Sequence, residues 1–121
     1  MTFSQSEQYS IHYLVQELIR ADRLVLLEEN VCWNTVSLKM GWGIVDSDTF
    51  AHMTMTDAID ILAQMDKDKK RFAAAFFVMI ILADQHVAPE EVTLLKTITE
   101  QAQLPHIPTA DCPDTLEQYV K

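Results

Sequence analysis

The chain has 121 residues, of which 49% are apolar and 22% are charged, and its formal net charge is −9. This length fits one domain that can bury a core, and this apolar fraction excludes an intrinsically disordered chain. The acidic excess argues against nucleic acid and against anionic membrane surfaces as partners, because both attract basic faces. It favours cations or basic protein surfaces instead.

Cysteine spacing and apolar run lengths narrow the class further. Cys32 and Cys112 are too far apart for a disulfide framework or a Cys-x-x-Cys metal site. The first residues lack the basic and apolar regions of a signal peptide. The longest apolar run, 72–83, is shorter than the roughly 20 residues that span a membrane. We therefore expect a cytoplasmic protein without an integral membrane segment.

Two helices are predicted in the first third of the chain. The first covers about 5–21, and its apolar residues recur at three- and four-residue intervals: Ile11, Leu14, Val15, Leu18 and Ile19. The second covers about 27–40, with Trp33, Val36 and Met40 on its inner face. Gly41 is expected to end it, because glycine accepts a left-handed backbone conformation. Asp46, Ser47 and Asp48 then offer caps for a short turn near 48–53.

The rest of the chain predicts three more long helices. Thr54 or Thr56 can cap a helix at about 57–66, whose apolar stripe is Ala58, Ile59, Leu62 and Met65. Asp68 is expected to cap the next, which reaches Ala83 and is apolar on all sides, as in the middle of a domain. Pro89 suits the first position of the last, whose expected inward residues are Val92, Leu95, Ile98 and Ala102.

Leu104-Pro105 is expected to end that helix, and the tail 104–121 forms at most a short closing helix near 114–120. No alternating strand pattern occurs in the sequence. We therefore predict one all-α domain over 1–121, a compact bundle of about six to seven helices.

An acidic phrase occurs twice. Residues 21–29 and 83–91 both read Ala-Asp-x-x-Val-x-x-Glu-Glu, 62 positions apart. The similarity continues around the phrase, since Leu18 and Ile19 correspond to Ile80 and Ile81. An internal repeat fixes the architecture. We predict two pseudo-symmetric helix–loop–helix repeats, at about 11–40 and 73–102, whose hairpins superpose.

The stretch Ile81–Glu91 resembles the tellurite-resistance TerB family, in which a helix ends in Ala-Asp-Gly and a Glu opens the next helix after a short loop. The resemblance is good over about 66–104 and fair over about 11–40. It implies an all-helical fold built from two similar halves, with an acidic, Ca²⁺-binding surface at the loops. The sequence departs from that pattern at Arg23 and Gln85, which stand at the glycine positions.

The candidate site consists of the repeated carboxylates, namely Asp22, Glu28, Glu29, Asp84, Glu90 and Glu91. Hard divalent cations prefer several oxygen ligands, and two adjoining acidic loops could supply them, with Ca²⁺ the first candidate. The alternative is helix capping, because a Glu in a first turn stabilises the helix dipole by about 0.3–1 kcal/mol without any ligand. Asp-x₅-Glu also lacks the ligand density of an EF-hand loop.

Other chemically distinctive residues have plain structural alternatives. His86 is either a nitrogen ligand or a solvated loop residue, and the other histidines share no ligand spacing. Cys32 aligns with Leu94 of the second repeat, which favours a core position. Trp42 either fills the junction of the two halves or anchors a partner.

No phosphate loop, dinucleotide fingerprint or nucleophile elbow is present in the sequence. We therefore expect a non-enzymatic stress-response domain that presents an acidic face to a divalent cation or a protein partner. Two other hypotheses stay open: a helical interaction module without a metal site, and a small metal-dependent hydrolase.

Overall fold

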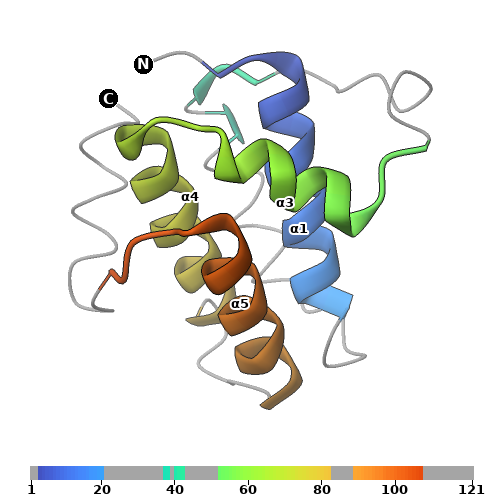
Figure 1. Cartoon of the computed structure of the whole chain (residues 1–121), viewed down its shortest axis with the longest axis vertical. Helices are drawn as coiled ribbons and strands as arrows, with labels where there is room; N and C mark the ends of the chain where they lie inside the picture. The colour runs from blue at the N-terminus through green and yellow to red at the C-terminus, as the bar shows by residue number, and fades with distance from the viewer. Residues whose placement is uncertain (1–2, 21–36, 39, 43–51, 83–88, 108–121) are drawn as a thin grey trace.

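The computed structural model describes residues 3–20, 37–38, 40–42, 52–82 and 89–107, and within these ranges the regular structure is helical (Figure 1). The helices are α1 (Gln5–Arg20), α3 (Met55–Ala63), α4 (Lys67–Leu82) and α5 (Pro89–Ala102). The predicted all-α class is therefore confirmed for this part of the chain. The count of six to seven helices and the two repeats involve residues outside these ranges, and they stay predictions.

The four described helices pack in one compact arrangement. Figure 1 shows α4 and α5 side by side and antiparallel, with α3 crossing in front of α1. Helix α1 contacts each of the other three helices, and α5 also contacts α3 and α4. Segments far apart in the sequence thus share one apolar interior.

Helix α4 supplies the largest part of that interior. Phe72, Phe76, Phe77 and Ile80 are all 0% exposed, which confirms the prediction that this helix is buried on several sides. Three successive alanines, Ala73–Ala75, are buried as well. Since alanine has only a methyl side chain, these positions allow neighbouring helices to approach α4 closely.

The predicted apolar stripes of α1 and α3 face this core. Ile11, Leu14, Val15 and Leu18 are 0% exposed. The stripe of α3 is buried too, including Met65 just beyond its end. The three- and four-residue spacing of apolar side chains therefore predicted the inner faces of both helices correctly.

The predicted inner face of α5 was wrong at one position. Ile98 and Ala102 are buried as expected, but Val92 is 48% exposed, and Glu91 is buried in its place. Successive residues of an α-helix are rotated by about 100° around its axis. Because Glu91 points into the core, Val92 points away from the centre of the core and is partly exposed to solvent. The apolar surface of α5 is consequently divided between the core and a second face.

Side-chain oxygens cap the N-termini of three helices. Ser4 and Glu7 form a reciprocal capping box at α1, with distances of 2.8 and 3.2 Å. Thr54 and Asp57 form another at α3, which confirms Thr54 as a cap. The expected cap of α4 was wrong: the Oδ1 atom of Asp66, not Asp68, accepts the backbone N–H of Lys69 at 2.9 Å. Helix α4 therefore starts at Lys67, and Asp68 lies in its first turn.

Two chain reversals use a left-handed residue. Gly41, at φ +73°, follows the described helical residues 37–38 and 40, and the backbone N–H of Trp42 donates to the carbonyl of Ser37 at 2.9 Å. This confirms Gly41 as a helix stop. At the end of α5, Gln103 adopts φ 57°, and Leu104 N–H donates to the carbonyl of Thr99. The same geometry is strained at Gln103, since only glycine avoids the clash of a Cβ there.

Aromatic rings and one ion pair connect the N-terminus to α4. The ring of Phe3 lies 5.4 Å from that of Trp42 and 5.1 Å from that of Phe72. Trp42 thus packs against the core as a half-buried residue. Lys69 Nζ donates to Glu7 Oε1 at 2.8 Å and lies 5.6 Å from the Phe3 ring centroid. One lysine therefore contacts both the α1 cap and the aromatic cluster.

The first prediction concerns Phe76, which is 0% exposed. Phe76→Ala should lower the free energy of unfolding by about 3–5 kcal/mol, because it removes a buried ring and leaves a cavity. Urea unfolding followed by circular dichroism measures this loss. A loss below about 1 kcal/mol would place the ring at the periphery.

The second prediction concerns pH. Burial raises the pKa of Glu7, but the hydrogen bonds from Lys69 and Ser4 and the charge of Lys69 outweigh it, so the pKa lies below its ordinary value. A carboxyl with a lowered folded pKa stabilises the fold above its unfolded pKa, and this contribution disappears as the pH falls through the folded pKa. Lys69→Met should therefore cost about 1–2 kcal/mol at pH 7 and clearly less near pH 3.

Urea unfolding of both proteins at the two pH values measures this difference. Lys67→Met is the matched control, because Lys67 is exposed and its change should cost little at either pH. An equal loss for Lys69→Met at pH 7 and pH 3 would show that the ion pair with Glu7 does not stabilise the fold.

Candidate functional site

Two of the six candidate carboxylates belong to the described chain, and both lie in the first turn of α5. Glu90 is exposed, whereas Glu91 is 1% exposed. Asp22, Glu28, Glu29 and Asp84 lie outside the described residues. The structure therefore locates the two glutamates of the second repeat. That the two acidic loops lie close together stays a prediction.

Glu90 and Glu91 differ in environment although they are neighbours in sequence. They are rotated by about 100° around α5, so one carboxylate faces solvent and the other faces the interior. Glu91 has a polar interaction there. A carboxylate is costly to bury unless other groups compensate its charge. The burial of Glu91 thus favours a structural role, and Glu90 is the carboxylate of this pair that solvent ions can reach.

The position of Glu90 also fits the capping alternative. The backbone N–H groups of a first turn have no partner within the helix, and they carry the positive end of its dipole. A negative side chain at this position is favourable with or without a bound cation. Exposure and position alone do not distinguish a metal ligand from a dipole partner.

Among the described residues, no group of three or more His, Cys, Asp or Glu side chains is close enough to hold a metal ion. The predicted cation site requires Asp22, Glu28 and Asp84 in addition to Glu90, and these three lie outside the described residues. The site is therefore neither assembled nor excluded by the helices that the structure describes.

The histidines within the described ranges are dispersed. His12 is half-buried on α1, with its ring 6.1 Å from that of Tyr9, and burial lowers the pKa of His12. His52 and His106 are exposed. His86, Cys32 and Cys112 fall outside these ranges. Trp42 packs against Phe3 and Phe72, which favours packing over partner anchoring for this residue.

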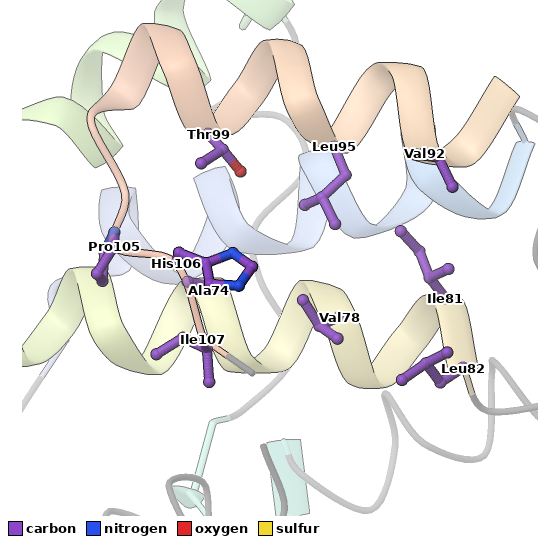
Figure 2. A pocket seen from close by; sticks show the side chains of 10 residues that line it. All are labelled: Ala74, Val78, Ile81, Leu82, Val92, Leu95, Thr99, Pro105, His106 and Ile107. Atoms are coloured by element: carbon purple, nitrogen blue, oxygen red, sulfur yellow. The ribbon is translucent and has the colours of Figure 1, made fainter. Parts of the chain in front are cut away.

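One feature was missed by the sequence interpretation: an apolar pocket between α4 and α5, with a volume of about 250 Å³. Figure 2 shows Val92 and Leu95 of α5 facing Val78 and Ile81 of α4 across it. The sequence did contain an indication of this pocket. Helix α4 has apolar side chains on more than one face, so some of them do not point into the core. The periodicity of α5 predicted that Val92 points into the core, whereas this residue lines the pocket. The pocket was therefore not predicted.

The third prediction separates the two glutamates of α5. Glu91→Ala should cost about 1–3 kcal/mol, because it removes the polar interaction of a buried side chain and leaves its space in the interior unfilled. Glu90→Ala should cost at most about 1 kcal/mol, the usual size of an exposed interaction with a helix dipole. Thermal and urea unfolding of both variants measure the order. A larger loss for Glu90→Ala would reverse the roles assigned to the pair.

The comparisons with known proteins bear on the fold alone. A crystal structure of a protein of unknown function from Porphyromonas gingivalis W83 matches with a TM-score of 0.79 over 96% of this chain and 98% of that chain, at 20% sequence identity. No protein-family model and no curated protein matches the sequence. The described helices include none that is long and apolar enough to cross a membrane. The chain is thus similar in fold to a protein whose own activity is unknown.

Proposed function

We propose that the chain is a cytoplasmic, non-enzymatic domain of the TerB-like type, which presents an acidic surface to a divalent cation, Ca²⁺ first, or to a protein partner. The observation that supports this most is the repeated acidic phrase, whose second copy presents Glu90 to solvent at the start of α5. A stress-response role of the tellurite-resistance type follows from the TerB resemblance of Ile81–Glu91 and belongs to the same proposal.

The distribution of charge supports an electrostatic role for the surface. The described core is apolar except for Ser10 and Glu91, and Asp60, Asp66 and Glu100 are exposed like Glu90. With a formal net charge of −9, the protein attracts cations and basic groups at long range. A bound divalent ion would relieve repulsion between the two acidic loops and would add ligand bonds.

The two-repeat interpretation specifies which residues would bind the ion. If the hairpins at about 11–40 and 73–102 are related by a pseudo-two-fold axis, then Asp22 and Glu28 approach Asp84 and Glu90. Hard cations accept carboxylates from separate loops, provided that six to eight oxygen atoms, water included, complete the shell. In this proposal Glu90 is the ligand of the α5 pair, because Glu91 is 1% exposed.

A helical interaction module without a metal site is the second candidate. Its support is the position of Glu90 in the first turn of α5, where the helix dipole alone stabilises a carboxylate. In this case the duplicated acids cap helices, and binding depends on other surfaces. The two candidates differ in how the stability of the fold responds to divalent cations.

The fourth prediction tests that response. A ligand that binds only the folded state raises the free energy of unfolding, by about 2.7 kcal/mol at a concentration one hundred times its dissociation constant. The melting temperature of the metal-free protein should therefore rise with added Ca²⁺, and Mg²⁺ and Mn²⁺ serve as comparisons. Asp84→Asn with Glu90→Gln should reduce this rise, while the metal-free form stays at least as stable.

The matched control is Asp60→Asn with Glu100→Gln, which removes two exposed charges from other parts of α3 and α5. It should keep the full response to Ca²⁺, because only the loop carboxylates bind the ion. An unchanged melting temperature of the parent protein in millimolar Ca²⁺, Mg²⁺ and Mn²⁺ contradicts the cation proposal. That result would leave the interaction module.

A further inference from the structure

The pocket between α4 and α5 has an apolar end and a polar end. At one end Ile81 and Leu82 of α4 face Val92 of α5 (Figure 2). At the other end, Figure 2 shows the hydroxyl of Thr99 and the imidazole ring of His106. The polarity of the walls therefore changes along the helix axes, which suits a ligand with an apolar chain and a polar head.

The length of the pocket suits a chain of moderate length. Lining residues extend from Ala74 to Leu82 on α4, and from Val92 to Thr99 on α5. With a rise of about 1.5 Å per residue, these stretches are roughly 10–12 Å long. Val92, at 48% exposure, is the large apolar side chain that α5 exposes most. An occupant would cover it.

Basic side chains flank the pocket although the protein as a whole is acidic. Arg71 precedes Ala74 by three residues on α4, so both lie on the same helix face, and Arg71 is exposed. Lys96 follows Val92 by four residues on α5 and is exposed as well. Together with His106 these residues place N–H donors around the polar end and along one side, while Glu100, four residues after Lys96, is an exposed acid on the same side of α5. An anionic head group complements them.

We propose that this pocket binds a free single-chain amphiphile with an anionic head, of the class of a medium-chain carboxylate. The chain lies between Val78, Ile81 and Val92, and the carboxylate lies at the end formed by Thr99 and His106, within reach of Arg71. This site is separate from the proposed acidic surface. Its existence does not depend on that proposal, because Glu90, the exposed carboxylate of the acidic phrase among the described residues, does not line the pocket.

Chain length and head-group charge are the two properties that the proposal fixes. Each methylene buried in an apolar site strengthens binding about fourfold, so decanoate should bind about fifteenfold more tightly than octanoate. Decanoate should also bind more tightly than decylammonium, although a net charge of −9 attracts the cationic amphiphile to the protein as a whole. Amide chemical shifts in ¹H–¹⁵N spectra, followed below micelle-forming concentrations, give the affinities and locate the site.

Variants with matched controls test the location. Val92→Glu puts a carboxylate in the pocket wall and should abolish decanoate binding, whereas Thr93→Glu adds the same charge at an exposed position that does not line the pocket and should leave binding unchanged. Arg71→Gln with Lys96→Gln should weaken decanoate binding about fivefold. Lys67→Gln, which removes one exposed charge nearer the start of α4, should have little effect.

Three results would overturn the proposal. The first is the absence of saturable shifts in α4 and α5 amides with decanoate. The second is equal or tighter binding of decylammonium, which would show that the basic residues do not select the head group. The third is undiminished binding to Val92→Glu when its spectrum shows the fold intact, because the chain would then lie elsewhere.

Discussion

Burial of α4 on most of its circumference is the constraint on which the rest of the described structure depends. Phe72, Phe76 and Phe77 are fully buried, and so are the alanines between them except for slight exposure of Ala74. A helix of this kind cannot lie on a surface, because its apolar area would remain in water. Other helices have to cover it, and both α1 and α5 pack against it.

The polar interactions of the fold lie mostly at the ends of this apolar interior. Ser4, Thr54 and Asp66 cap the three N-termini that approach it. Lys69, in the first turn of α4, joins this helix to the cap of α1 through its ion pair with Glu7. These contacts contribute less than burial does, but they fix where each helix begins. They therefore set the register in which the apolar stripes meet.

The pocket is a consequence of the same constraint. Helix α4 is apolar beyond the sector that α1 and α5 cover, and its remaining apolar side chains need another neighbour. Pro105, His106 and Ile107 fill only part of the space between α4 and α5, so a pocket of about 250 Å³ remains. The feature proposed to bind an amphiphile thus arises from packing, whereas the feature proposed to bind a cation arises from the duplicated acidic loops.

Local patterns were sufficient to predict most of the described fold. The stripe of α1 and the stop at Gly41 each depend on residues within one or two helical turns, and both were predicted correctly. The cap of α3 was narrowed to Thr54 or Thr56, and it is Thr54. The predictions for Val92 and Asp68 were wrong. The rotation of α5 is set by tertiary contacts that periodicity does not contain, whereas the start of α4 is set by the local cap at Asp66, which stands two residues before the aspartate that was chosen. Periodicity alone also does not predict which of Glu90 and Glu91 is buried, or which apolar residues line the pocket and which lie in the core.

The measurement that tests the central role of α4 most directly is native-state hydrogen exchange of its backbone amides. If α4 is the helix on which the others pack, its central amides, from Phe76 to Ile80, exchange only through global unfolding, with protection equal to the free energy of unfolding. Amides near the ends of α1, α3 and α5 exchange through smaller openings and are less protected. Central α4 amides that exchange faster than those of α1 or α3 would contradict this account.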